Sequence, residues 1–379
     1  MRQGLALEIS CDPKNQPVTK RYNRILRDDR QQAKVQDNGA ENKDFCASTF
    51  VDNIMTEGDG RACDESSERF NSYELPPYYD PKMFKRGQAF FHRHYFGMFL
   101  GSFLGLLCGL SMKFSLEILK LTGMSSSEYT SYKRYIATIL HMLIWYDGDF
   151  QPGSKLWKSI EDVKFKHNSA SKKSKCVLKY GIDQKSMALT QFGFIGFAIT
   201  RRSYLGVHNA SEYDLKCFIH VWRVLGYVMG IEDEFNICRD SVKETEAICE
   251  EILQKVVKPQ FERESSSDYN EMVTYMIDGL WSLNPFLDTE SFQFYLKMLL
   301  NSCPLAKIPE TEEYKSLSRL AKIKVKIVIQ HVIFMRFSLI RNLLNYVQRA
   351  GIWIIQRYPF LAFYRYGKAN SYIRVMGPN

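Results

Sequence analysis

The chain has 379 residues, of which 45% are hydrophobic and 14% aromatic, enough to bury one large core or two small ones. Its nine cysteines are scattered without any CxxC spacing, which excludes a zinc ribbon or a disulfide framework and predicts reduced thiols in a cytosol-facing protein. The net charge is +9, but no nucleic-acid-binding module is recognisable, so we expect no nucleic-acid partner.

Residues 1–72 are polar and weakly patterned. Such a segment buries little apolar surface, so we expect it to be disordered. Its beginning has no apolar run long enough for a signal peptide, and we therefore expect a protein that is not secreted. After the segment LPPYYDP, a helix is predicted to begin at Asp80–Pro81, because an aspartate cap followed by proline is typical of a helix start.

The most apolar stretch covers residues 95–119, with 18 uncharged residues from Tyr95 to Met112. This length is the lower limit for a membrane span. Glycine recurs there at every fourth position, at 97, 101, 105 and 109, and small residues at this spacing let helices pack closely in membranes or in soluble cores. The sequence therefore leaves two interpretations open, a buried core helix and a membrane span.

Helical periodicity continues through the rest of the chain, whereas alternating strand patterns with hairpin turns are absent. We expect an all-α protein with a single large helical domain over residues 73–365, after the segment 1–72 and before a short tail at 366–379. The helices are predicted over residues 125–148, 154–167, 183–199, 211–230, 240–257, 267–281, 288–301, 311–330, 332–350 and 351–363.

The C-terminal part is basic and apolar at once. From Tyr314 to Asn379 the sequence contains 12 lysines and arginines and no acid. Residues 332–363 mix four of these arginines with isoleucine, leucine, phenylalanine and tryptophan, a composition that favours an anionic membrane surface. The alternative is that this segment packs on the domain with its arginines in water.

One histidine stands out within the helix at 211–230. Ser211 and Asp214 form an S-x-x-D capping box at its start. The helix is apolar on all sides, so we expect it to be buried on all sides. His220 lies on the face opposite Trp222, and it is either a core histidine bonded to a backbone carbonyl or a metal or haem ligand.

The other histidines are less informative. His167 is expected near a helix end among lysines, in a surface or capping role. His141 is expected in the core, and His92 and His94, among arginines and aromatic residues, on an exposed or interfacial face.

Four segments together resemble a known family: LPPYYDPKMFKRGQAFFHRHYFG, PGSKLWKSIEDVKFKHNSAS, SMALTQFGFIGF and HNASEYDLKCFIHVWRVLGYVMGIEDEFNIC. They resemble the catalytic domain shared by rubber oxygenases (latex clearing proteins) and MpaB-type ER-bound oxygenases, over residues 75–350. The resemblance implies a globin-like all-α core that binds haem b and cleaves carbon–carbon double bonds of polyisoprenoids with dioxygen.

The resemblance assigns His220 as the axial haem ligand, with His167 as the alternative. A Lys–Thr pair that lines the distal side in the family falls on Leu189 and Thr190, so the lysine is missing. Thr190 is then the expected distal hydrogen-bond donor. The family's arginine one turn earlier is also missing, because Ser186 stands there.

Lys185 is a candidate polar partner on the distal side. The side chains expected to line the cofactor with His220 are Leu189, Val224 and Tyr227. The predicted function is a haem-dependent oxygenase-like protein acting on a hydrophobic isoprenoid or lipid substrate. The predicted location is the cytoplasm or the cytoplasmic face of an intracellular membrane, such as that of the ER. The alternative is a catalytically inactive, membrane-associated helical scaffold of the same fold, which the missing lysine and arginine favour.

Overall fold

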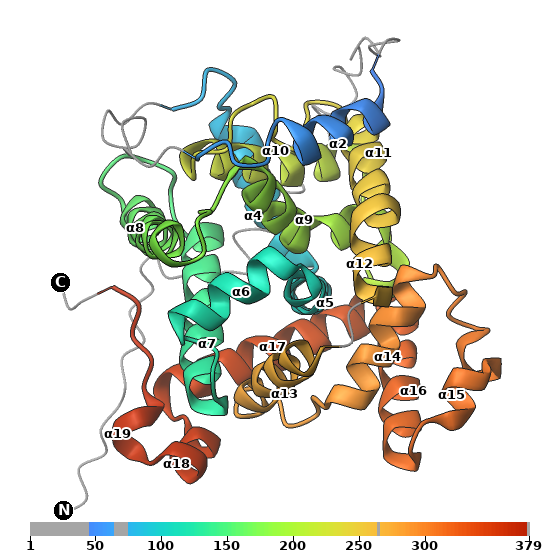
Figure 1. The fold of residues 1–379 in the computed structure, drawn as a ribbon. Coiled ribbons are helices and arrows are strands. Elements are labelled where there is room, and N and C mark those ends of the chain that lie inside the picture. Colours follow the sequence, from blue (N-terminus) through green and yellow to red (C-terminus); the bar gives the residue numbers. More distant parts are fainter. Residues whose placement is uncertain (1–44, 64–74, 264–265, 377–379) are drawn as a thin grey trace, which may run out of the picture.

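The computed structural model describes residues 45–63, 75–263 and 266–376 (Figure 1). Regular structure in these ranges is helical apart from an isolated bridge between Ala62 and Asp183. The helices are α2 (Ala47–Thr56), α4 (Pro81–Arg93), α5 (Tyr95–Ser111), α6 (Lys113–Thr122), α7 (Glu128–Asp147), α8 (Lys155–Val177), α9 (Gln184–Thr200), α10 (Glu212–Val228), α11 (Val242–Ile252), α12 (Lys258–Arg263), α13 (Ser267–Trp281), α14 (Thr289–Leu300), α15 (Glu312–Ser316), α16 (Arg319–Phe334), α17 (Ser338–Arg357), α18 (Phe360–Tyr366) and α19 (Lys368–Ser371). The all-α, single-domain prediction is confirmed.

Helix α5 lies at the centre of the bundle, and contacts α9 on one side and α13, α14 and α17 on others (Figure 1). Thirteen of its side chains or glycines are buried, so the structure follows the core-helix interpretation of this stretch. Among the described helices, none is long and apolar enough by itself to cross a membrane. Helices α4 and α5 meet that requirement only as a pair, and they are bent by 91° against each other.

Helix starts follow local sequence signals. Asp80 caps α4 by accepting hydrogen bonds from the backbone N–H groups of Lys82 and Met83, with proline at the next position. Ser211 caps α10 by accepting from the N–H of Asp214. The predicted capping box is thus half present, because the Asp214 carboxylate instead pairs with Arg86 of α4.

Two segments outside the predicted domain are part of the fold. The disorder predicted for residues 1–72 is wrong for residues 45–63, where α2 forms and packs on α11 with Val51 and Ile54 buried. Val51 and Ile54 stand between polar stretches, so the composition of the segment does not indicate a helix here. The remainder of 1–72 lies outside the described residues. Near the other end, the Tyr132 hydroxyl donates to the carbonyl of Ser371 at 2.5 Å, which fixes α19 against α7.

Candidate functional site

His220 lies midway along α10 and is 7% exposed. Its Nε2 accepts a hydrogen bond from the backbone N–H of Asp80 at 3.1 Å, and its ring is stacked on Tyr79 with 6.3 Å between centroids. Burial lowers the pKa of His220 to about 4. The imidazole is therefore neutral near pH 7, and its Nε2 lone pair is already used in holding the start of α4.

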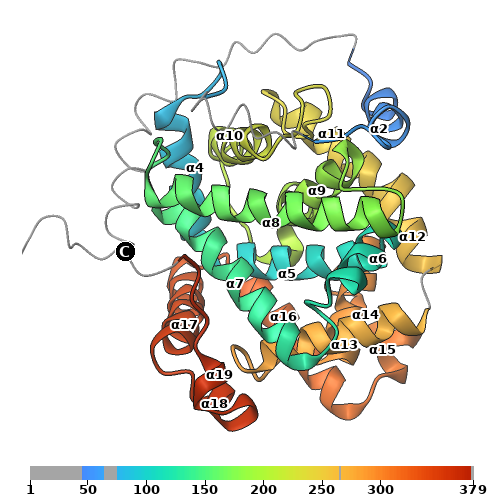
Figure 2. The ribbon, with the colours of Figure 1, turned by 60° about the vertical axis from the view of Figure 1, so that its left-hand side comes forward.

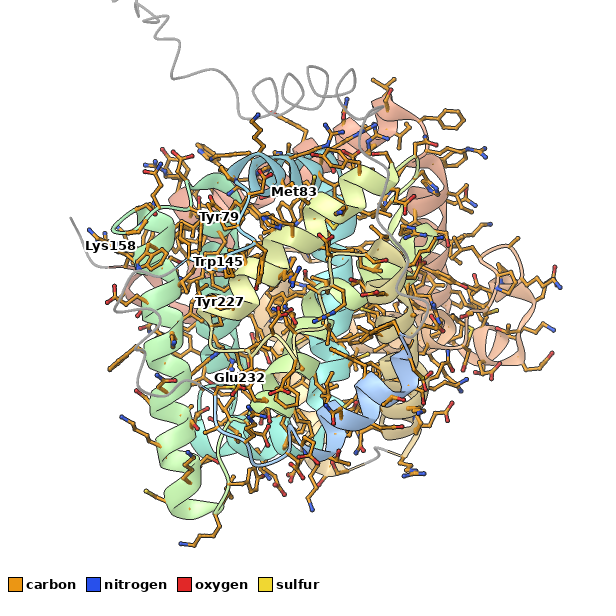
Figure 3. The ribbon with its side chains drawn as sticks, turned by 90° about the horizontal axis from the view of Figure 1, so that it is seen from above. Tyr79, Met83, Trp145, Lys158, Tyr227 and Glu232 are labelled. Carbon is orange, nitrogen blue, oxygen red and sulfur yellow. The ribbon has the colours of Figure 1, made fainter. Side chains whose placement is uncertain are left out.

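The surroundings of His220 on its open side are charged. A shallow hollow there is lined by Met83, Lys216, Arg223, Arg239 and Asp240, and it encloses no volume that a water molecule could occupy. Figure 3 shows Tyr79 and Met83 beside α10, with Tyr227 near the C-terminal end of this helix. A site for a flat apolar macrocycle would need a deep, mostly apolar cavity instead.

Helix α9 packs against a different face of α10. The Gln191 side chain donates to the backbone carbonyl of Trp222 at 2.8 Å, and Phe194 stacks on the Trp222 ring at 4.9 Å. A Cβ on Gly226 would come within 2.7 Å of the Gln191 amide, so the two helices are in direct contact. Trp222 and His220 are two residues apart, about 200° around a helix, so His220 points away from α9.

The predicted distal residues consequently do not meet His220. Thr190 is exposed, and its hydroxyl donates to the Ser186 carbonyl at 2.7 Å within α9. Lys185 pairs with Asp59, just after α2. Leu189 is buried in the core.

Two of the residues expected around the cofactor do share the His220 face. Val224 is fully buried there, one turn further along α10. Tyr227 is half-buried and makes an edge-on contact with Tyr78 at 6.2 Å between ring centroids. Tyr227 thus contacts the segment that precedes α4, as His220 does. The roles assigned to Val224 and Tyr227 stay predictions.

His167, the alternative ligand, is not near a helix end, because α8 continues to Val177. Its Nδ1 is enclosed without a hydrogen bond, and burial lowers its pKa to about 4. It lines a cavity of about 10 Å³ together with Cys63, Asn168, Ser171, Ile182, Met187 and Met229. That volume admits about one water molecule, far less than any prosthetic group requires.

The histidine that the sequence analysis missed is His94, at the bend between α4 and α5. Both of its ring nitrogens are enclosed without hydrogen-bond partners, and the ring lies 4.9 Å from that of Phe90. His92 is buried as well and contacts the Tyr146 carbonyl at 3.2 Å. The exposed or interfacial position predicted for both is wrong, because α17 covers the bend. The polar sequence His92-Arg93-His94 does not indicate that another helix packs over it.

Within the described residues, no group of three or more His, Cys, Asp or Glu side chains is arranged to hold a metal ion. The acids at 232–234, which the sequence places after α10, pair with arginines: Glu232 and Glu234 with Arg61, and Asp233 with Arg223. These acids therefore form a partly exposed, ion-paired turn after α10.

The buried histidines predict an acid-sensitive fold. Burial is the largest cause that lowers the pKa of His94 well below 6.5, and the charges of Arg341, Arg93 and His208 lower it further. The unfolded chain takes up protons below about pH 6.5 and the folded chain does not, so stability is complete above that pH and falls as pH falls. The loss approaches about 1.4 kcal/mol per pH unit for each such histidine.

Replacing His94 by phenylalanine is therefore expected to flatten this dependence by one proton between pH 6.5 and 5. At pH 7 it is expected to leave the free energy of unfolding unchanged or about 1 kcal/mol higher, because no hydrogen bond is lost. Urea unfolding at pH 7 and pH 5 measures both effects. His92→Phe is the control, because it loses the Tyr146 contact and should destabilise at both pH values. An equally steep pH dependence in His94→Phe would contradict the prediction.

A solved structure of latex clearing protein in its closed state is similar to this chain, with a TM-score of 0.52 and 13% sequence identity. The match covers 75% of this chain and 77% of that chain. Comparisons with protein-family models and with curated proteins give no match. The chain therefore has a rubber oxygenase-like fold, as the sequence resemblance implies, and the likeness to MpaB-type enzymes stays a prediction.

Haem b, which the resemblance implies, does not fit the residues around His220 as they are packed. The imidazole lone pair accepts the Asp80 N–H, and the adjoining hollow is shallow and charged. The residues assigned to the two sides of the cofactor lie on α9 and on the face of α10 that points away from it. A haem at His220 would require the Asp80 N–H to give up its acceptor and the hollow beside it to open.

Proposed function

We propose that this chain is a membrane-associated helical protein of the rubber oxygenase-like fold that works without haem at His220. The observation that carries the proposal is the hydrogen bond from the Asp80 N–H to His220 Nε2 at 3.1 Å. An axial ligand must offer this lone pair to iron. Here the lone pair instead fixes the residue that caps α4.

The Asp80–His220 contact is supported on both sides. Asp80 is held by its own bonds to the first turn of α4, and His220 by the stacked ring of Tyr79. Freeing the imidazole would leave a part-buried backbone N–H without this partner, a cost of about 1 kcal/mol. The fold therefore favours the state in which His220 Nε2 accepts this hydrogen bond.

The proposed location is the cytoplasmic face of an intracellular membrane. All eight described cysteines are free thiols, which agrees with a reducing compartment. The C-terminal helices expose apolar and basic side chains together.

The second candidate is a haem b-dependent oxygenase that uses dioxygen on a hydrophobic isoprenoid or lipid substrate. It is favoured by the neutral, buried imidazole at the position that the resemblance assigns to the axial ligand, and by the fold shared with latex clearing protein. The two candidates differ in whether the purified protein contains haem.

The test is the absorption spectrum of the full chain purified from haem-replete cells. We expect no Soret band, and we expect His220→Ala to lower stability, because the Asp80 N–H loses its acceptor. A Soret band that disappears in His220→Ala, but persists in His141→Ala and His167→Ala, would establish the oxygenase candidate instead. Circular dichroism confirms that each variant is folded before its spectrum is compared.

A further inference from the structure

Helix α17 is amphipathic in the sense opposite to that of a soluble protein. Its buried residues are Arg341 and Asn345 in the first half and Ile352 and Ile355 in the second half, so polar side chains make up half of its inward side. Its exposed side carries the large hydrophobic side chains Leu339, Leu343, Tyr346, Val347, Trp353 and Ile354. These six, called here the α17 face, recur at helical spacing along one side, whereas a surface helix ordinarily directs such a stripe to the core.

The polar side of α17 faces inward because it completes the bend between α4 and α5. Asn345 donates to the Arg93 carbonyl at 2.9 Å and accepts from the Phe96 N–H at 2.9 Å. Arg349 contacts the His92 carbonyl at 3.2 Å, and its guanidinium lies 3.9 Å from the centre of the Tyr95 ring. These bonds satisfy backbone groups that the bend would leave unpaired, so the apolar stripe is held outward.

The exposed apolar surface continues beyond α17 into α18. The ring of Trp353 contacts that of Tyr358 at 5.6 Å, and Tyr358 stacks on Phe360 at 6.0 Å, all three being exposed. Of the exposed large hydrophobic side chains in the described part of the chain, all but Met124, Phe165 and Val177 lie between Leu320 and Tyr372. Figure 2 shows α17 and α18 together along one side of the bundle.

The charge around this surface indicates what covers it. Arg336 and Arg357 are exposed at the two ends of α17, and the sequence from Tyr314 onward has no acidic residue. Anionic headgroups attract such arginines, while tryptophan and tyrosine are enriched at the depth just below them. An exposed apolar stripe with an arginine at each end is the arrangement of a helix that lies in the plane of the surface.

We propose that the α17 face inserts into an anionic lipid surface, with Arg336 and Arg357 on the headgroups and the bundle above. This deepens the membrane association in the proposed function, on which it rests, and it does not depend on whether haem is bound. The apolar stripe of α17 is then buried in lipid, whereas that of an ordinary surface helix is buried against the protein core.

The test is co-sedimentation of the full chain with vesicles of phosphatidylcholine alone or with phosphatidylserine. We expect binding to the anionic vesicles and partial release at high salt. The variant Leu343→Glu/Trp353→Glu changes two side chains that are 55% and 54% exposed, so it should fold normally and bind at least tenfold more weakly. Phe165→Glu is the matched control, because this α8 side chain is 70% exposed outside the α17 face, and it should bind as the parent does.

The outcomes separate the two proposals. A folded parent chain that stays in the supernatant with every vesicle at low salt would overturn the proposed membrane association itself. Vesicle binding unchanged in Leu343→Glu/Trp353→Glu would leave that association and overturn the α17 face as its site. A dimer without vesicles that the same variant dissociates would assign the face to a second copy of the chain. Point substitutions are used because removing α17 would uncover the α4–α5 bend.

Discussion

Gly105→Ala is expected to destabilise the protein more than any other glycine-to-alanine change in α5. A Cβ at this position would lie 1.7 Å from the backbone carbonyl oxygen of Gly193 in α9. No side-chain rotation relieves that contact, so the two central helices must separate. We expect a loss of about 3 kcal/mol or more in the free energy of unfolding, at or beyond the upper end for overpacked cores, measured by urea unfolding.

Gly109→Ala is the matched control in the same helix. Nothing lies within 4 Å of a Cβ built there, so alanine should be neutral or stabilise by up to about 1 kcal/mol through its higher helix propensity. Gly193→Ala is the second comparison, because its Cβ would meet the Gly105 carbonyl at an ordinary 3.4 Å. Equal effects of Gly105→Ala and Gly109→Ala would show that the close approach of α5 and α9 is not present.

The glycine spacing shows how far sequence reasoning reaches. A four-residue repeat predicts a face of close helix packing, and three of the four glycines do meet backbone or side chains of α9 or of the 3-10 helix Arg202–Leu205 after it. The spacing does not show which element approaches each glycine, because that depends on the tertiary packing. The repeat also does not show that Gly109 has no neighbour within 4 Å of a Cβ built there.

The fold was predictable because the signals that specify it are local. Apolar periodicity over most of the chain and the caps at Asp80 and Ser211 are confirmed in the structure. Helix ends were less certain: α8 continues ten residues beyond its predicted end, because its lysine-rich half shows little apolar patterning. The apolar periodicity is weak where a helix is mostly exposed, so the end of such a helix is harder to predict from the sequence.

The candidate site was less predictable because its contacts join distant parts of the chain. The burial and neutrality of His220 followed from an apolar helix, but its partner Asp80 lies 140 residues away. The direction in which His220 points relative to α9 depends on which face of α10 carries Trp222 against Phe194. The inward polar side of α17 likewise follows from a bend some 250 residues earlier in the chain, which the composition of the segment does not show.

Arg86→Met is expected to be the most disruptive change at the interface between α4 and α10. The Arg86 guanidinium bonds the Asp214 carboxylate through Nε at 2.9 Å and Nη2 at 2.8 Å, and both side chains are about 5% exposed or less. The substitution leaves the carboxylate out of water, with the Arg93 guanidinium at 3.8 Å. Breaking a buried pair on one side costs about 3–5 kcal/mol, and chemical denaturation at pH 7 should show a loss of that size.

The double variant Arg86→Met/Asp214→Leu distinguishes the interaction between the two charges from the cost of burying them. Replacing both partners by apolar side chains removes the unpaired charge, and such replacements are often neutral or stabilising. We therefore expect the double variant to recover most of the stability lost in Arg86→Met, with a coupling free energy of about 3 kcal/mol or less between the two sites. The recovery is limited by two losses, since Asp214 also favours the first turn of α10 as an acid near a helix N-terminus and the Arg86 guanidinium contacts the Tyr213 ring at 4.8 Å. A double variant as unstable as the sum of the single ones would mean that Arg86 and Asp214 act independently, and the interface would then rest on the apolar contacts of α4 with α10.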